Sequence, residues 1–151
     1  MPPDLLEICK RVVRDPKYQP EDVDKDGDLD TKCNFAVWDI CAEMGYSKFK
    51  DLKLVANQIF EHLITLPEWS LVDGLRAQIQ ANQNKLAIAA QRGDPHGHVA
   101  VVAPGDMEMV KSAKWNKKVP LVANVGPKQR MGIMGSNFAF GSEPNYFILI
   151  P

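Results

Sequence analysis

The sequence contains few cysteines, no long apolar run and no marked excess of charge of either sign. It has no stretch of 18 apolar residues, so we expect no transmembrane helix and no membrane insertion. Three cysteines are too few for a disulfide scaffold, and the odd number predicts at least one free thiol. The 18 basic and 19 acidic side chains give a net charge of -1, which argues against nucleic acid as the main partner. The start of the chain, Met1 to Asp4, lacks the basic and apolar regions of a secretory signal peptide.

Several common catalytic and binding motifs are also missing. The sequence has no G-x-S-x-G, no H-E-x-x-H, no paired C-x-x-C and no phosphate-loop motif. These absences exclude the usual forms of serine hydrolase, zincin, zinc ribbon and P-loop protein. A chain of 151 residues corresponds to one typical domain, so we predict a single domain over residues 1–151. We also expect a monomer.

The hydrophobic pattern changes midway along the chain. Apolar residues at helical spacing occur in the first half, and short runs rich in Ala, Val and Ile occur in the second half. Helices are predicted at about 4–14, 32–45, 51–66 and 70–82, and strands at 85–91, 98–102, 120–125 and 146–150. A capping box of Ser70 with Asp73 is expected to start the fourth helix. Helices followed by an antiparallel sheet predict the α+β class.

An acidic loop precedes the second predicted helix. Carboxylates occur at every second position, with Gly27 after the third: Asp22, Asp24, Asp26, Asp28 and Asp30. Alternate side chains of such a loop converge on one Ca²⁺ ion, and the glycine permits a sharp turn. The twelfth position, where an EF-hand has a bidentate Glu, is Cys33. We predict a calcium site in which Asp28 contributes its backbone carbonyl and the other four contribute side chains. The other interpretation is a solvated acidic loop.

Cys33 directly follows this loop, at a predicted helix start that Thr31 can cap. A thiolate is the reactive form of cysteine, and the positive end of a helix dipole stabilises it. Cys33 is therefore a candidate nucleophile. Cys9 and Cys41 lie on apolar helical faces, where we expect buried, unreactive thiols.

A cysteine nucleophile requires a base and, usually, a residue that orients the base. His98 opens a predicted strand and is slightly favoured over His96, which lies in a turn. His62 lies in the middle of a helix, where a surface or packing role is expected. Asn124 could orient His98 if strand 120–125 pairs beside strand 98–102, although an Asn at a strand end is often only a turn residue.

Two further features have a structural and a functional interpretation. The run Lys111 to Lys118, with Trp115 inside it, is typical of a solvated loop but could also contact an anionic polymer. Trp69 could pack in the core or stack on a sugar, and Asn57 and Asn82 could line a groove beside it.

Three segments in this order resemble a known group of enzymes. They are residues 31–39 around Cys33, Gly97 to Val102 with His98, and Val122 to Gly126 with Asn124. Together they resemble the papain-like peptidoglycan cysteine hydrolases of the CHAP and NlpC type, including phage endolysins, over roughly residues 22–126. One position departs from the group, because Val122 stands where CHAP members often have a Glu.

The resemblance implies a papain-like arrangement, with the nucleophile helix packed on a C-terminal antiparallel sheet. It implies Cys33 as nucleophile, His98 as general base and Asn124 as the orienting group. It also implies a Ca²⁺ loop at Asp22 to Asp30, because some CHAP endolysins carry such a loop just before the nucleophile. The expected function is hydrolysis of bacterial peptidoglycan by an amidase or endopeptidase, which would lyse the cell wall and act as an antimicrobial.

Other functions remain open on the sequence. A non-catalytic, calcium-dependent module that binds a glycan or a protein would keep the Asp loop and use Cys33 structurally. A toxin-like amidase delivered by a secretion system would share the chemistry of a phage lysis enzyme. In either enzymatic case, we expect synthesis in the cytoplasm and action on the wall after release or delivery. The sequence does not distinguish between the bonds that could be cut.

Overall fold

The structure, a computed structural model, describes residues 3–20, 32–106, 111–127 and 130–151. The predicted calcium ligands Asp22 to Asp30, and Thr31, lie outside these residues. The helices are α1 (Leu5–Arg14), the 3-10 turn η1 (Pro16–Tyr18), α2 (Cys33–Glu43), α3 (Lys48–Asp51), α4 (Ala56–Thr65), α5 (Gly74–Asn82) and α6 (Ser136–Ala139). The strands are β1 (Trp69–Val72), β2 (Ala87–Gln91), β3 (His98–Val102), β4 (Lys111–Ser112), β5 (Lys117–Lys118), β6 (Leu121–Asn124), β7 (Gly132–Gly135) and β8 (Asn145–Leu149).

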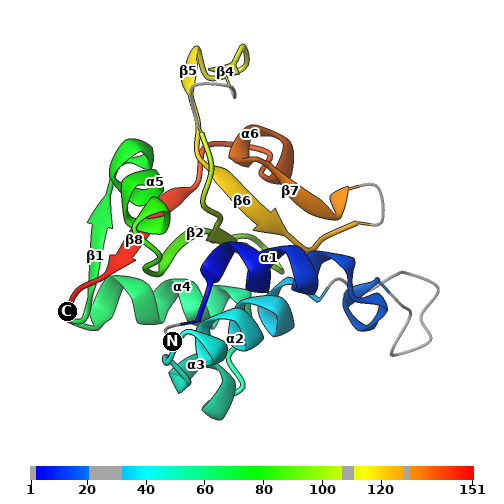
Figure 1. The fold of residues 1–151 in the computed structure, drawn as a ribbon, viewed down its shortest axis with the longest axis vertical. Coiled ribbons are helices and arrows are strands. Elements are labelled where there is room, and N and C mark those ends of the chain that lie inside the picture. The colour runs from blue at the N-terminus through cyan, green and yellow to red at the C-terminus, as the bar shows by residue number, and fades with distance from the viewer. Residues whose placement is uncertain (1–2, 21–31, 107–110, 128–129) are drawn as a thin grey trace.

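Within the described residues, six strands form one antiparallel sheet in the order β1-β8-β2-β3-β6-β7. The last strand, β8, lies between β1 and β2, so it occupies the position next to the edge strand β1. Strands β4 and β5 pair separately as a small hairpin that projects from the molecule (Figure 1). The combination of helices with an antiparallel sheet confirms the α+β class.

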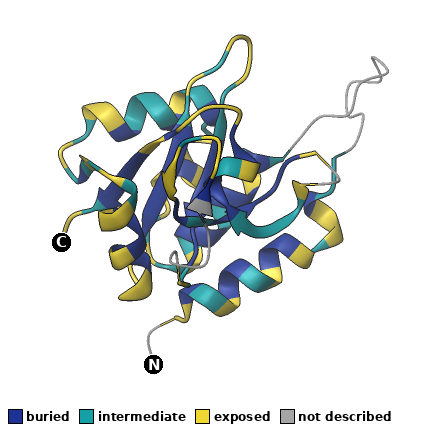
Figure 2. Ribbon diagram, turned by 90° about the horizontal axis from the view of Figure 1, so that it is seen from above, coloured by how far each residue is buried: buried dark blue, intermediate teal, exposed yellow. Residues whose placement is uncertain are grey.

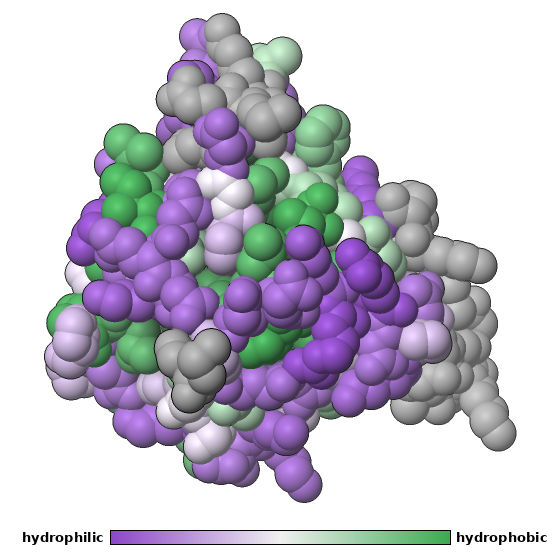
Figure 3. Space-filling model, in the orientation of Figure 1, coloured by the Kyte–Doolittle hydropathy of each residue, from purple (hydrophilic) through white to green (hydrophobic). Residues whose placement is uncertain are grey.

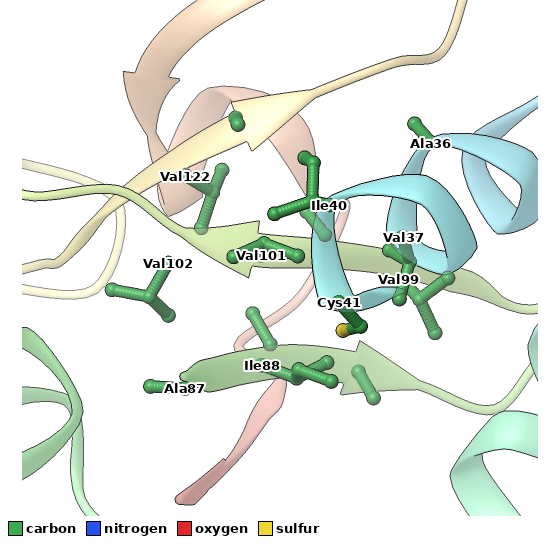
Figure 4. Packing of buried hydrophobic residues seen from close by; sticks show 14 of the residues in the cluster. Ala36, Val37, Ile40, Cys41, Ala87, Ile88, Val99, Val101, Val102 and Val122 are labelled. Carbon is green, nitrogen blue, oxygen red and sulfur yellow. The ribbon is translucent and has the colours of Figure 1, made fainter. Parts of the chain in front are cut away.

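Helices cover the sheet on both sides. In the view of Figure 1, α1 to α4 lie below the sheet and α5 lies above β2 and β8. Most residues of strands β2, β3, β6 and β8 are buried, and Figure 2 shows buried strands inside the molecule. Figure 4 shows Val37, Ile40 and Cys41 of α2 packed beside Val99 and Val101 of β3. Each such buried aliphatic side chain stabilises the fold by roughly 1.5–3 kcal/mol. This packing fixes the helix that begins with Cys33 against the strand that begins with His98.

The expected helix over 51–66 is wrong in its first part. Residues 48–51 form the short helix α3, and Lys53 then adopts a left-handed backbone conformation with φ 51°. A positive φ interrupts a helix, so α4 begins only at Ala56.

The expected helix over 70–82 is also wrong at its start. Residues 69–72 form the edge strand β1, because they pair with β8 from Trp69–Leu149 to Val72–Tyr146. The helix α5 begins at Gly74, and the side chain of Asp73 caps it by accepting a hydrogen bond from Arg76 N at 2.9 Å. The capping box of Ser70 with Asp73 is therefore replaced by a single Asp73 cap. Strand β7 and helix α6 were not expected from the sequence.

The face shown in Figure 3 is mostly hydrophilic, with separate hydrophobic patches. One patch lies over α5, where Leu75 and Ile79 are exposed. In the part of the chain that the structure describes, none of the helices combines the length and the apolarity needed to cross a membrane.

Candidate functional site

Cys33 is the first residue of α2, as the sequence predicts. Lys32 occupies the N-cap position without a side-chain hydrogen bond to the helix. The N–H groups of the first turn therefore have no helical partner and face the start of the helix. Burial of the apolar face of α2 against β3 holds this helix start in place, and Cys33 itself is only 5% exposed.

His98 and Asn124 form a hydrogen-bonded pair on neighbouring strands. His98 Nε2 lies 2.6 Å from Asn124 Oδ1, and Asn124 Nδ2 donates to the carbonyl of Arg130 at 2.7 Å. Asn124 is fully buried and His98 is partly buried. The expected pairing of strand 120–125 beside strand 98–102 is confirmed by β3 and β6.

The strand register explains why two residues 26 positions apart meet. Val101 pairs with Ala123 and Val102 with Val122, so the same register continued places Gly126 opposite His98. A Cβ atom on residue 126 would lie 3.3 Å from Asn124 Nδ2 and 3.8 Å from His98 Cε1. The missing side chain of Gly126 thus leaves room for the imidazole and the amide to meet.

The hydrogen bonds of Asn124 determine which nitrogen of His98 carries the proton. Because Nδ2 of Asn124 donates to Arg130, its Oδ1 faces His98 and can only accept. The Nε2–H of His98 must therefore be the donor, and the lone pair of the neutral ring lies on Nδ1. Nδ1 is the basic nitrogen of this arrangement.

Cys33 lies beside the start of β3. The backbone N–H of Val99, the residue after His98, interacts with the Cys33 sulfur. Burial, the largest influence, raises the pKa of the Cys33 thiol, while the N–H groups of Val99, Asn34 and Cys33 lower it. The expected stabilisation of the thiolate by the helix start is present but is outweighed by burial. The resting thiol is therefore protonated at neutral pH.

The environment of His98 shifts its pKa in the opposite direction and also favours the neutral form. Burial lowers the pKa of His98, the hydrogen bond with Asn124 acts against this, and the positive charge of Arg130 acts with it. The ring of Phe140 packs on the imidazole with centroids 4.7 Å apart. A neutral, oriented imidazole can act as a general base towards a protonated thiol.

A turn anchored on α4 holds the start of β3. Asn57 Nδ2 donates to the carbonyls of Gly93 at 2.8 Å and Pro95 at 3.2 Å, and Asn57 Oδ1 accepts from Gly93 N at 3.1 Å. Asn57, expected to line a groove, instead fixes the turn that precedes His98.

The other histidines lie elsewhere. His96 is exposed in the turn. His62 Nε2 lies 3.3 Å from the hydroxyl of Tyr46, which donates to Glu68 at 2.8 Å. This supports the packing role expected for His62.

Trp69 is 5% exposed and donates to Tyr46 at 3.0 Å, so it packs in the core. Asn82 contacts Gly105 at a different turn.

The basic run 111–118 forms the β4–β5 hairpin, in which Lys117 pairs with Glu143 at 2.6 Å. Cys9 and Cys41 are buried free thiols, as expected.

The described residues on either side of the acidic loop are fixed close to each other. Lys32 Nζ donates to the carbonyl of Lys17 at 3.1 Å, and the hydroxyl of Tyr18 donates to Asp39 on α2. Tyr18 and Lys32, the described residues that flank the segment with the five aspartates, therefore both lie beside α2. Its alternating carboxylates suit a hard cation with oxygen ligands, whereas the thiol of Cys33 cannot supply the bidentate carboxylate of an EF-hand. Among the described residues, no group of three or more His, Cys, Asp and Glu could hold a metal ion.

Sequence reasoning did not identify Gly126, Arg130 and Phe140 as part of this site. Gly126 ends the segment Val122 to Gly126 that resembles the enzyme group. Its position opposite His98 follows only from the register of β3 with β6. Arg130 contributes a backbone carbonyl, which no sequence pattern reveals, and Phe140 comes from the end of an unexpected helix.

Comparison with models of known protein families and with curated proteins finds no match to this chain.

Proposed function

We propose that this protein is a cysteine hydrolase that cleaves an amide bond in bacterial peptidoglycan. The observation that carries the proposal is the His98–Asn124 pair at 2.6 Å, which leaves Nδ1 as the basic nitrogen, at the strand start against which Cys33 is packed. The order of the three motifs, and their resemblance to CHAP and NlpC enzymes, supports peptidoglycan as the substrate.

The reaction begins with proton transfer from the thiol to His98. Nδ1 takes the proton as the sulfur attacks the amide carbonyl, which avoids a free thiolate in a buried site. The first-turn N–H groups of α2 stabilise the negative oxygen of the tetrahedral intermediate. The imidazolium then protonates the leaving amine, the C–N bond breaks, and a thioester forms.

Water completes the cycle. His98 Nδ1 removes a proton from water as it attacks the thioester carbonyl, and the C–S bond breaks. The proton returns from His98 to the sulfur, and a carboxylic acid is released. Asn124 keeps Nε2 protonated throughout, so Nδ1 is the nitrogen that takes up and releases the proton.

A bound Ca²⁺ is part of the proposal. Asp22, Asp24, Asp26 and Asp30 would bind it through side chains and Asp28 through its carbonyl, and the ion would order the loop that leads into Cys33. The flanking contacts of Lys32 and Tyr18 with the rest of the protein are consistent with such a loop.

Lysis of purified cell walls tests the hydrolase. Wild-type protein should clear a suspension of purified peptidoglycan, and Cys33→Ala should abolish clearing while its circular dichroism spectrum is retained. Cys9→Ala removes a sulfur from the core outside the site and should keep the activity. Undiminished clearing by Cys33→Ala would refute the proposal. Mass spectrometry of the digest would identify the bond.

The alternative, a non-catalytic calcium-dependent binding module, is favoured by one observation. Burial raises the pKa of the Cys33 thiol, as expected for a structural cysteine. In such a module the thiol would react slowly whether or not His98 is present.

A further inference from the structure

A pocket adjoins the candidate catalytic residues through side chains and backbone that contact His98 and Asn124. Its volume is about 440 Å³, and its lining includes Arg130, Lys114, Asn137, Phe138 and Phe140. Phe140 packs on His98 from this side, and the backbone of Arg130 accepts the hydrogen bond of Asn124. A group bound in this pocket would therefore contact Phe140, which in turn contacts the imidazole.

The charge of the pocket is positive. Arg130 and Lys114 both line it, and no acidic residue is among the described residues of its lining. Glu143, close in sequence, pairs with Lys117 at 2.6 Å. Lys114 donates to the carbonyl of Gly141 at the pocket edge, and neither Lys114 nor Arg130 forms an ion pair with a described carboxylate. Two cations without an acidic partner favour an anionic ligand.

One residue of the pocket lining carries a hydrogen-bond acceptor without a partner among the described residues. Asn137 Oδ1 is buried and has no donor among the described residues. Buried polar atoms normally have a partner, so this oxygen indicates a donor supplied by a ligand. The rings of Phe138 and Phe140 add an apolar wall.

We propose that this pocket binds a free carboxylate on the amino-acid unit next to the scissile amide, and that the enzyme thereby selects carboxylate-bearing over amidated stem peptides. Arg130 and Lys114 pair with the carboxylate, and Asn137 Oδ1 accepts an N–H of the same peptide. The substrate assignment rests on the proposed function, whereas binding can be measured without any turnover.

Two synthetic tripeptides test the selection. L-Alanyl-γ-D-glutamyl-L-lysine carries a free α-carboxylate on its second residue, and the D-isoglutamine counterpart carries a carboxamide there. We expect the carboxylate peptide to bind Cys33→Ala protein at least about 10-fold more tightly in calorimetry, because a charge-assisted contact replaces a neutral one.

Further variants test which residues cause the preference for the carboxylate peptide. When Arg130→Gln is added to the Cys33→Ala protein, the cation that pairs with the carboxylate is lost. The dissociation constants of the two peptides should then differ by no more than about twofold. Adding Arg76→Gln, which removes an exposed charge on α5, should keep the wild-type ratio. Asn137→Ala should weaken both peptides, because both offer the same N–H groups. Circular dichroism verifies that each variant is folded.

Equal affinity for the two peptides, or no measurable binding of either, would overturn the pocket assignment. A ratio that Arg130→Gln leaves unchanged would overturn it as well. The proposed hydrolase function is tested separately. It would fail if wild-type protein left purified cell walls intact.

Discussion

At the scale of single residues, the site combines a thiol that burial keeps protonated with an imidazole that burial keeps neutral. The pair therefore does not rest as a thiolate and an imidazolium. Proton transfer has to occur as the sulfur attacks, so the reactivity of Cys33 should depend on Nδ1 of His98 and on the orientation that Asn124 gives it.

Alkylation by iodoacetamide measures this dependence. At pH 7, Cys33 in wild-type protein should react at least about 10-fold faster than in His98→Ala, because the base assists loss of the thiol proton. The assisted reaction should persist below pH about 6.5, since the pKa of His98 is lowered, and Asn124→Ala should give an intermediate rate. His98→Ala should react only in alkaline solution, because burial raises the pKa of the thiol.

Cys33→Ala is the control for this experiment. Burial raises the pKa of Cys9 to about 12 and also raises that of Cys41, so this variant should take up no label. The same rate and pH profile in wild type and His98→Ala would rule out activation of Cys33 and would favour the binding module.

At the scale of elements, the geometry of the candidate site depends on the short connection between β2 and β3. Gly97 lies directly before His98, where the backbone passes close to α4 and β2. A Cβ on residue 97 would lie 2.4 Å from Asn57 Oδ1 and 2.5 Å from the carbonyl of Gln91. The position therefore requires glycine for lack of space, and any side chain there would displace the turn.

Gly97→Ala should lower stability and lysis together. Forcing Asn57 from its hydrogen bonds and crowding the Gln91 carbonyl should cost roughly 2–3 kcal/mol. For a chain of this length, that corresponds to a loss of roughly 5–10 °C in Tm, measured by differential scanning fluorimetry. Gly141→Ala is the matched stability control, because a Cβ at Gly141 has no atom within 4 Å. Equal Tm values for the two variants would show that the turn tolerates a side chain.

At the scale of the whole molecule, the acidic loop concentrates negative charge in a protein with a net charge of only -1. Residues 22–30 contain five Asp and one Lys, a net of -4, so the remaining 142 residues carry +3. A cation bound by the loop would reduce the repulsion among the aspartates and couple metal binding to stability.

Calcium should therefore raise the melting temperature. At a free Ca²⁺ concentration about 100-fold above Kd, linkage stabilises the folded state by about 2.7 kcal/mol, or roughly 5–10 °C in Tm. Chelation should reverse the shift and reduce lysis. Asp24→Asn with Asp26→Asn should abolish the response, whereas Asp94→Asn, the same type of substitution in an exposed turn, should preserve it. An unchanged Tm after chelation, in protein that elemental analysis shows to be metal-free, would remove Ca²⁺ from the proposal.

The pH dependence of stability belongs to the same scale. Burial lowers the pKa of both His98 and His62 in the folded protein. Below pH about 6.5 the unfolded chain therefore takes up protons that the native state does not bind, and stability falls as the pH is lowered from about 7 towards 5. The contribution is fully present above pH about 6.5.

Urea denaturation at pH 7.5 and 5.5 measures this loss. His62→Gln combined with His98→Gln should reduce the difference between the two free energies of unfolding. His96→Gln, at an exposed position, should leave the difference as in wild type. An undiminished difference in the double variant would assign the pH dependence to other groups.

Local sequence signals determined much of this architecture. Periodicity placed α1, α2 and the strands β2, β3, β6 and β8 close to their observed positions, because burial of an apolar face or run depends mainly on nearby residues. The same signals placed Cys33 at a helix start and His98 at a strand start. Residues 69–72 were misassigned because a four-residue edge strand carries little periodic pattern, and its pairing partner β8 lies more than 70 residues away.

Only the tertiary structure decided how the candidate site is assembled. The β3–β6 register brings His98 to Asn124, the backbone of Arg130 fixes the amide, and packing under α2 buries Cys33 enough to raise its pKa. The sequence specifies the chemical groups and the elements that carry them. Register, backbone hydrogen bonds and burial depend on contacts between distant segments, and these contacts decide which groups meet and which of them is protonated.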